Sequence, residues 1–446
     1  MYRWNPLAKA RLVLVGCLLV APASAQDTSL PTPRELPPIE EKPADGLSLD
    51  EAIELLLQRN YDLRLKFQEI PKARADVLSA GLRNNPSVFF SADGIPYSKY
   101  SPQRPGETDY ELTLIQPTDV SGKRRRRIQL AERAERVIEA LYQDAVRLEI
   151  DKLYGAYADV LGATIGVQAG RAELALQIEL VKTARDLVRQ GGLRPRSELT
   201  QAQVNRSKAE AALRRAESNL LQFRRDLAVL LAVPAEQTDA LTLSGSIRDS
   251  FPSPPCVDDL IRLALRVRPD LMAYRLNVDR AQAQVRRTQA ERIDDVLLFY
   301  TPYQIQSFPS QPSQAALGWE TGALTVLPVF DRKQGELARA NVEVAQSQTE
   351  VRGVEPQVIN EVRQAAIDYA VSRESVERFE REMLPGARRV LDEKERSVAS
   401  GIAGRDVMLS ARKDYNDVAR QYGEALLRHR RDMLKLNTAV GQRLLP

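Results

Sequence analysis

Side chains able to do acid–base, nucleophilic or metal chemistry are few and scattered in this sequence. His429 is the single histidine, and it lies on an apolar helical seam, which favours a packed core histidine over a ligand. Two cysteines and five methionines are present, without the grouping that a metal site needs. No nucleophile elbow, phosphate loop, zinc motif or nucleotide fingerprint can be read. We therefore predict no enzyme, no cofactor and no metal site.

Five consecutive basic residues, Lys123, Arg124, Arg125, Arg126 and Arg127, form a strong local charge. They fall at the start of a predicted helix, where the helix dipole disfavours cations and so favours a local anionic partner. We interpret the run as a membrane interface that pairs with outer-membrane lipid phosphates, with a solvated helix start as the alternative. Because the whole chain has 64 basic and 60 acidic residues, no nucleic-acid partner is indicated.

The N-terminus has the three-part layout of a secretory signal. Basic residues precede a short apolar run at 12–20, and Ala23-Ser24-Ala25 forms a small-residue cleavage site. We predict that residues 1–25 are removed, while Cys17, which follows a lipoprotein-like box, leaves lipidation as an alternative. Cleavage after Ala25 would leave only Cys256, so no internal disulfide is expected.

The elements that must position these residues occur twice along the chain. The segment from Ser48 to Leu63 is echoed by the segment from Cys256 to Leu271, which indicates duplication of a whole subdomain. Each half has the order helix, strand, strand, helix, helix. The predicted divisions are a signal peptide at 1–25, an N-terminal linker at 26–46, a first repeat at 47–234, a Pro/Ser-rich linker at 235–255, a second repeat at 256–441 and a C-terminal tail at 442–446.

Helical periodicity predicts helices at about 48–84, 123–190 and 197–231 in the first half. In the second half the two later helices fall at about 332–399 and 405–440. A seven-residue apolar spacing predicts coiled-coil packing, with an ordinary helical bundle as the alternative. The seams are Ala134, Ile138, Leu141, Ala145 and Leu148; Ala209, Leu213, Ala216, Leu220, Phe223, Leu227 and Leu230; and Tyr415, Ala419, Tyr422, Leu426, His429, Met433 and Leu436.

Particular residues set the ends and bends of these helices. Ser48 and Glu51 form a capping box at the start of the first one. Pro71 predicts a kink or break inside that helix, and Pro356 and Pro385 predict bends in the long helix of the second half.

Two pairs of short strands are predicted, at 87–94 and 109–117 and at 296–303 and 323–330. Each strand has about the length that a tilted strand needs to cross a bilayer. Four strands cannot close a barrel, and open sheet edges are not tolerated within a bilayer. Several copies of the chain must therefore contribute to one barrel.

Together these features resemble the outer-membrane efflux protein family, whose best-known member is TolC. The resemblance covers about residues 47–441. The run from Gln116 to Ile128 is more similar to members that serve heavy-metal cation pumps. The residues that carry the resemblance are Ser48 to Ala52 with Asn60 and Leu63, their echo at 256–271, Gln116-Pro117 with Gly122-Lys123-Arg124, Pro328-Val329-Phe330, and the glycine-centred turns at 190–197 and 400–407.

The resemblance implies a mainly α fold with a small β part. It implies a homotrimer whose 12-stranded outer-membrane β-barrel continues into a long periplasmic α-helical coiled-coil barrel. Such a protein is the passive exit duct of a tripartite efflux system, located in the outer membrane and extending into the periplasm. Its partners would be a periplasmic adaptor protein and an inner-membrane efflux pump, and its cargo small solutes, with metal cations as one candidate.

The resemblance also implies a gate of carboxylates and salt bridges at the lower tip. The positions that are acidic in the family fall near Val407 and Ser410, and the nearby acid in this sequence is Asp406, beside Arg405. In the first half, Ser197 and Glu198 fit the partner positions better. We expect the two helical turns to dock the adaptor; their residues are Gly191, Gly192, Leu193, Gly401, Ile402 and Gly404.

Two functions of other classes stay open. A structural coiled-coil protein of the cell envelope without channel activity would have polar strands and would not insert into a membrane. A coiled-coil scaffold for nucleic acid would have to stay in the cytoplasm, against the export signal. The strand pairs distinguish best, because a plain scaffold has no need of them.

Overall fold

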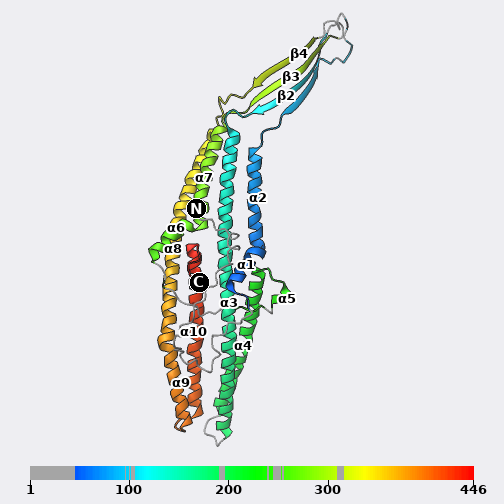
Figure 1. The fold of residues 1–446 in the computed structure, drawn as a ribbon. Helices are drawn as coiled ribbons and strands as arrows, with labels where there is room; N and C mark the ends of the chain where they lie inside the picture. The colour runs from blue at the N-terminus through cyan, green and yellow to red at the C-terminus, as the bar shows by residue number, and fades with distance from the viewer. Residues whose placement is uncertain are drawn as a thin grey trace, which may run out of the picture. The chain divides into compact units, whose positions relative to one another are not determined.

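The chain forms long helices and one antiparallel sheet, and it divides into two compact units (Figure 1). Unit 1 takes in the described parts of Met1–Leu65, Gln143–Arg268 and Gln357–Pro446, and unit 2 takes in those of Lys66–Tyr142 and Pro269–Pro356. The predicted signal peptide lies outside the described residues. The computed structural model describes residues 46–95, 97–99, 101, 106–189, 196–238, 241–244, 253, 256–308 and 316–445.

The sheet belongs to unit 2 and has the strand order β1-β2-β3-β4, with every neighbouring pair antiparallel. Its strands are β1 (Ser87–Asp93), β2 (Thr108–Thr118), β3 (Val296–Ser307) and β4 (Ala316–Leu324). The two halves of the sequence thus meet in the central pair β2–β3. Irregularities in register, typical of β-bulges, lie between Leu112 and Leu114 and between Thr301 and Gln304.

The prediction for the fourth strand was wrong. It was expected at 323–330, whereas β4 ends at Leu324. The register explains the difference, because Leu324 pairs with Leu297 and β3 begins only one residue earlier, at Val296. Residues beyond Thr325 therefore have no residue of β3 to pair with. The other three strands lie within a few residues of their predicted positions.

The first predicted helix is two helices, α1 (Leu49–Arg59) and α2 (Tyr61–Gly81). The capping box at Ser48 is present, with its hydroxyl accepting from the Glu51 N–H and the Glu51 carboxylate accepting from the Ser48 N–H. The break falls at Asn60 and not at Pro71, which lies inside α2. The second half repeats the break at Arg268, between α6 (Val257–Val267) and α7 (Pro269–Ala290).

The long helices match their predicted ranges closely. They are α3 (Lys123–Arg189), α4 (Arg196–Leu230) and, in the second half, α8 (Gln334–Arg378), α9 (Leu384–Ala399) and α10 (Arg405–Val440). Pro356 does not interrupt α8. One turn of π-helix, Phe379–Met383, joins α8 to α9, so the long helix is interrupted just before Leu384 and Pro385.

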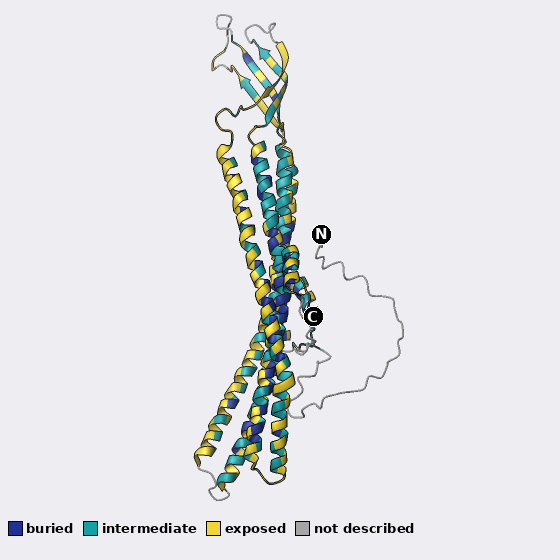
Figure 2. Ribbon diagram, turned by 90° about the vertical axis from the view of Figure 1, so that its left-hand side faces the viewer, coloured by how far each residue is buried: buried dark blue, intermediate teal, exposed yellow. Residues whose placement is uncertain are grey.

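The structure confirms the predicted apolar seam of α10 and contradicts that of α3. All seven residues predicted on α10 are buried in unit 1, which confirms that seam (Figure 2). The prediction for α3 was wrong, since Leu141 and Leu148 are exposed whereas Val146 and Leu153 are buried. Apolar spacing marks a candidate face of a helix, whereas the neighbours of α3 decide which of its faces is buried.

The described parts of the Pro/Ser-rich linker and of the C-terminal tail make contacts with the rest of unit 1. Part of the Pro/Ser-rich linker forms α5 (Ala235–Thr238), and Leu243 makes a parallel β-bridge with Leu47. In the predicted tail, the Leu444 and Leu445 N–H groups donate to the Asn437 side chain at 2.9 Å, and Arg443 pairs with Asp50 at 2.5 Å. Residues 443–445 are therefore part of the packed body of unit 1.

Candidate functional site

The two faces of the four-stranded sheet differ in chemistry. The register places one set of apolar side chains on a single face, and each of them is exposed although it lies in a strand. Among the described residues this face has no packing partner, and its aliphatic and aromatic side chains suit contact with an apolar medium. Its residues are Val88, Phe90, Tyr110, Leu112, Leu114, Leu298, Tyr300, Tyr303, Ile305, Leu317 and Trp319.

The opposite face carries polar contacts between the strands. The hydroxyls of Thr113 and Thr301 lie 2.9 Å apart, and both residues are buried. The Gln304 amide donates to the Glu111 carboxylate at 3.1 Å. At the end of this face nearer the helices, the ring of Phe299 covers Gly322 so closely that a Cβ there would lie 2.4 Å from it.

All charged residues of the four described strands are acidic. They are Asp93, Asp109, Glu111 and Glu320, and the register places all four on the polar face. Asp93 and Asp109 are direct partners across β1 and β2. The strands that the structure describes contain no lysine or arginine, so this face has one sign of charge.

A polar junction joins the strands to the helices of unit 2. Asp295, which directly precedes β3, pairs with the Lys123 ammonium at 2.8 Å and accepts from the Asn84 amide at 3.0 Å. The Asp119 carboxylate caps α3, accepting from the backbone N–H of Lys123 at 3.0 Å and of Arg124 at 2.8 Å. These two carboxylates offset the unfavourable meeting of a basic run and a helix N-terminus.

The five basic residues therefore have protein partners for the most part. The Arg124 guanidinium donates to the Gly81 carbonyl at 2.5 Å, Arg127 donates to the Leu82 carbonyl at 3.4 Å, and Arg126 contacts Gln129 at 3.0 Å. Of the run, only Arg125 is exposed. Groups of the chain itself thus take part of the role of the anionic partner that the sequence predicts. Fewer residues of the basic run are open to lipid than predicted.

The turn between α9 and α10 has the geometry of a Schellman motif. Gly401 has φ +76°, its N–H donates to the Val398 carbonyl, and the Ile402 N–H donates to the Ser397 carbonyl. A left-handed conformation at this point favours glycine. The turn projects Ile402 into solvent, with 84% of its surface exposed.

The residues predicted for the gate lie at helix starts in unit 1. Arg405 and Asp406 open α10 directly after Gly404, with Val407 and Ser410 exposed on the following turn. Ser197 and Glu198 open α4 and are exposed. Figure 1 shows the α3–α4 and α9–α10 hairpins ending at the same end of unit 1. Gly191, Gly192 and Leu193 lie outside the described residues.

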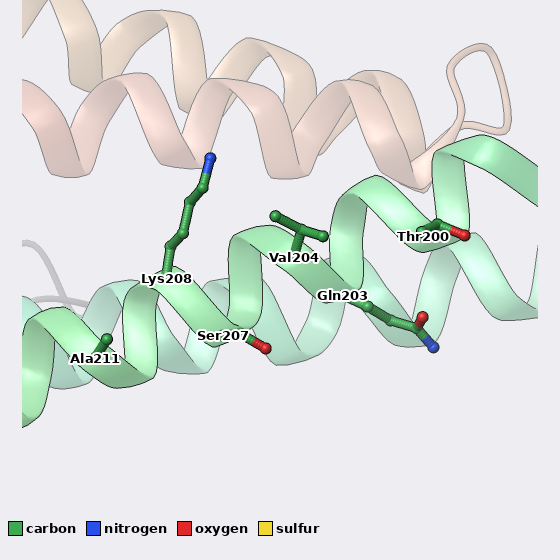
Figure 3. A pocket seen from close by; sticks show the side chains of 6 residues that line it. All are labelled: Thr200, Gln203, Val204, Ser207, Lys208 and Ala211. Atoms are coloured by element: carbon green, nitrogen blue, oxygen red, sulfur yellow. The ribbon is translucent and has the colours of Figure 1, made fainter.

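A shallow hollow lies along one helix of unit 1. Figure 3 shows its side chains, with Val204 and Lys208 directed toward neighbouring helices and Gln203 and Ser207 directed elsewhere. Side chains that come from one helix and do not converge do not make a small-molecule site. The lining residues are Thr200, Gln203, Val204, Ser207, Lys208 and Ala211, all from α4.

His429 is packed inside unit 1, as predicted. Its Nδ1 lies 3.0 Å from the Ser372 hydroxyl, and its ring stacks on Tyr369 with centroids 4.9 Å apart. Burial, aided by the charges of Arg373 and Arg430, lowers the pKa of His429 to about 4. The ring is therefore neutral near pH 7. Among the described residues no group of three or more His, Cys, Asp or Glu is placed to hold a metal ion.

Sequence reasoning missed the structural roles of several residues that stabilise each unit from within. Asn60 and Arg268 anchor the helix breaks, and Asn84 bonds to Asp295. Asn60 and Arg268 occupy corresponding positions in the two repeats, so a closer alignment of the halves would have singled out this pair. None of the described helices is long and apolar enough to cross a bilayer.

Comparison with known proteins gives one family match over most of the chain. A model of the outer membrane efflux protein family matches residues 52–233 and 260–442. The cobalt-zinc-cadmium resistance protein CzcC of Cupriavidus metallidurans is 24% identical over 384 residues, which cover 86% of this chain and 85% of CzcC.

Solved structures share the fold at low sequence identity. The CmeC outer membrane channel of Campylobacter jejuni has a TM-score of 0.70 at 16% identity, over 96% of this chain and 95% of CmeC. VceC of Vibrio cholerae has a TM-score of 0.69 at 18% identity, over 88% of this chain and 96% of VceC. These matches confirm the mainly helical fold with a small antiparallel sheet.

Proposed function

Because the chain belongs to the outer membrane efflux protein family, we propose that it is the passive exit duct of a tripartite efflux system. The family is one of efflux channels and not of enzymes, and the match confirms the resemblance seen in the sequence. In this proposal the protein lies in the outer membrane and extends into the periplasm. It receives solutes from a periplasmic adaptor and an inner-membrane pump.

The single observation that carries the proposal is the two-faced sheet. Its exposed apolar face has the composition of a lipid-facing surface, and its other face has the acidic and amide groups of a water-filled lumen. Among the described strands, β1 and β4 each have one neighbour in the sheet, which leaves both outer edges for pairing with other strands. Since three copies would supply 12 strands, a trimeric barrel satisfies every edge.

Exposed apolar side chains on the helices also support a homotrimer. Three apolar residues of α2 and one of α8 have most of their surface exposed. They are Tyr61, Leu65 and Phe67 on α2 and Val342 on α8. A monomer in water would not favour this exposure, whereas packing against neighbouring copies would bury it. A structural coiled-coil protein without a channel predicts polar strands, which is not what the sheet has.

Metal cations are the cargo that we propose. The relative CzcC carries resistance to cobalt, zinc and cadmium in its name. The acidic polar face of the sheet would lower the energy of cations and raise that of anions in a lumen. A duct needs no tight metal site, because cargo must leave as readily as it enters.

We further propose that the hairpin ends at 190–198 and 400–410 dock the adaptor and form the gate. Arg405 and Asp406 are the charged pair at the start of α10, and Ser197 and Glu198 are the polar residues at the start of α4. Their placement at one end of unit 1 supports this assignment. At the strand–helix junction, the exposed Arg125 is the member of the basic run that we assign to lipid phosphates.

Cysteine labelling of the two sheet faces tests the proposal. In a C256S background, Leu114→Cys on the apolar face and Glu320→Cys on the polar face are compared in outer-membrane vesicles. A water-soluble maleimide should modify Glu320→Cys and spare Leu114→Cys, and unfolding in detergent should expose both. Equal labelling of the two in folded protein would contradict a membrane-inserted sheet.

A further inference from the structure

The polar face of the sheet has an apolar half. Residues that pair directly across antiparallel strands point to the same face, so the register sorts the side chains of this face into rows. The rows farther from the helices hold Asp93, Asp109 and the contact between Glu111 and Gln304. The rows nearer the helices are largely apolar. Their apolar side chains, here called the apolar half, are Phe89, Ile115, Leu297, Phe299 and Leu324.

The apolar half is accessible to solvent. Phe89 is 53% exposed and Leu324 is 60% exposed, while Phe299 is partly covered by β4. Lipid does not cover these side chains in the proposed duct, because the lipid-facing side chains lie on the other face of the sheet. An apolar surface that meets water favours a ligand with apolar surface of its own.

Phe299 has a defined place in the apolar half because of a glycine. Phe299 pairs with Gly322 across β3 and β4, and a Cβ on Gly322 would lie 2.4 Å from the tip of the Phe299 ring. The missing side chain thus lets the ring lie against β4. Gly318, on the same face of β4, differs from Gly322, because a Cβ there would meet nothing within 4 Å. Glycine is therefore required by the ring at 322 and not at 318.

A carboxylate lies beside this ring. Glu320 pairs with Thr301, and Phe299 pairs with Gly322, so Glu320 and Phe299 are diagonal neighbours on one face of β3 and β4. Diagonal neighbours are about 7–8 Å apart, a separation that aromatic and long side chains can span. Glu320 is exposed, so its carboxylate can meet a cation from solution. Glu111 differs, because its carboxylate accepts a hydrogen bond from Gln304 at 3.1 Å.

We propose that Phe299, Glu320 and Ile115 form a binding site for organic cations that have an apolar body. The carboxylate and the aromatic ring both attract the positive head group, and the apolar half takes up the body. A hydrated metal ion has no apolar surface to bury there, so it gains only the attraction of the carboxylate. The inference rests on the proposed duct function, because closure of the sheet into a barrel is what makes this face a wall of the lumen.

Equilibrium binding to the full-length protein in detergent tests the site, with benzyltrimethylammonium as the probe. Tetramethylammonium lacks the apolar body and benzyl alcohol lacks the charge, so each should bind about tenfold more weakly than the probe. Glu320→Gln should weaken binding of the probe about tenfold, since the opposite charge is lost. Phe299→Leu keeps an apolar side chain without the aromatic ring and should also weaken it. Phe90→Leu, on the lipid-facing side of β1, is the matched control and should bind as the wild type does.

Gly322→Ala tests the placement of the ring without removing a group of the site. Its Cβ must displace the Phe299 ring, so the affinity for benzyltrimethylammonium should fall by a factor of about ten. Gly318→Ala adds the same methyl group to the same face of β4 where there is space, so the affinity should stay at the wild-type value. Equal affinities of the two alanine variants would show that the ring takes no part in binding.

Binding of benzyltrimethylammonium no tighter than that of the two other probes would overturn the site. Wild-type affinity in both Glu320→Gln and Phe299→Leu would overturn it as well. Channel recordings separate this inference from the duct. A protein that binds the probe at these residues and never conducts would keep the site and refute the duct, whereas a conducting protein that binds all three probes alike would refute the site alone.

Discussion

Asn60 and Arg268 occupy the same position in the two repeats and make the same contact. The Asn60 amide donates to the Leu230 carbonyl at 3.1 Å, at the end of α4, and the Arg268 guanidinium donates to the Ala439 carbonyl at 3.0 Å, at the end of α10. Both residues have extended ψ angles of 124° between two helices. Each thus breaks one helix and satisfies a carbonyl that the end of another leaves open.

Arg268→Ala should destabilise the protein more than Asn60→Ala. Arg268 is only 4% exposed and also pairs with Glu361 at 2.6 Å, so its loss leaves a buried carbonyl and a carboxylate without this partner. We expect a loss of about 3 kcal/mol for Arg268→Ala and about 1 kcal/mol for Asn60→Ala. Denaturant unfolding in detergent measures both. Equal, small losses of stability in the two variants would show that the hydrogen bonds of Asn60 and Arg268 to the two carbonyls do not stabilise the protein as proposed.

Two glycine substitutions should change stability in opposite directions. Gly122, before α3, has φ +75°, so Gly122→Ala should cost about 1 kcal/mol. Gly155 lies within α3 and an added Cβ would meet nothing within 4 Å, so Gly155→Ala should add roughly 0.5–1 kcal/mol. Thermal unfolding of the two variants beside the wild type checks this. If both substitutions lower the stability, steric crowding around the added Cβ, and not backbone conformation, determines the effect at these positions.

Stability should fall as the pH is lowered from about 6.5 to about 4, in part because of His429. The pKa of this buried imidazole is lowered to about 4 from an ordinary 6.5, so the unfolded chain binds the proton first. The contribution is fully present above pH 6.5 and amounts to at most about 3 kcal/mol. His429→Gln, which can still bond to Ser372, should flatten this part of the curve of unfolding free energy against pH. An unchanged slope would assign the pH dependence to other groups.

Neutralising the acidic face of the sheet should weaken cation preference. Asp109→Asn combined with Glu111→Gln removes two of the four strand carboxylates. In a salt gradient, the reversal potential should shift toward that of a less selective pore. Glu336→Gln on α8, outside the strands, is the matched control. No difference between the double variant and the control would contradict the assignment of this face to the lumen.

The sequence is sufficient to predict the duplicated order of elements, because long apolar periodicities and short β-branched and aromatic runs are local signals. It predicts the burial of His429 for the same reason. It misplaces β4, because the end of that strand is set by the start of β3 and not by its own residues. It also expects a break at Pro71, whereas the break falls where Asn60 finds a distant carbonyl.

Contacts far apart in sequence account for most of what the sequence does not reveal about the candidate site. From the sequence, the basic run is expected to face lipid. In the structure, Asp295 pairs with Lys123 and the Gly81 carbonyl accepts a hydrogen bond from Arg124. Likewise, Pro385 predicts a bend in the long helix but not the turn of π-helix at Phe379–Met383. The bond between Tyr422 and Glu380 joins two helices whose pairing the local pattern does not specify.

Ion conductance in a planar lipid bilayer tests the central claim most directly. Purified, correctly processed protein should insert and give discrete, small conductance steps. The steps should grow when Asp406 and Glu198 are both replaced by alanine, because a gate at the hairpin ends would lose its charges. Folded protein that neither inserts nor conducts, with or without these changes, would contradict the duct and support a structural coiled-coil protein of the envelope.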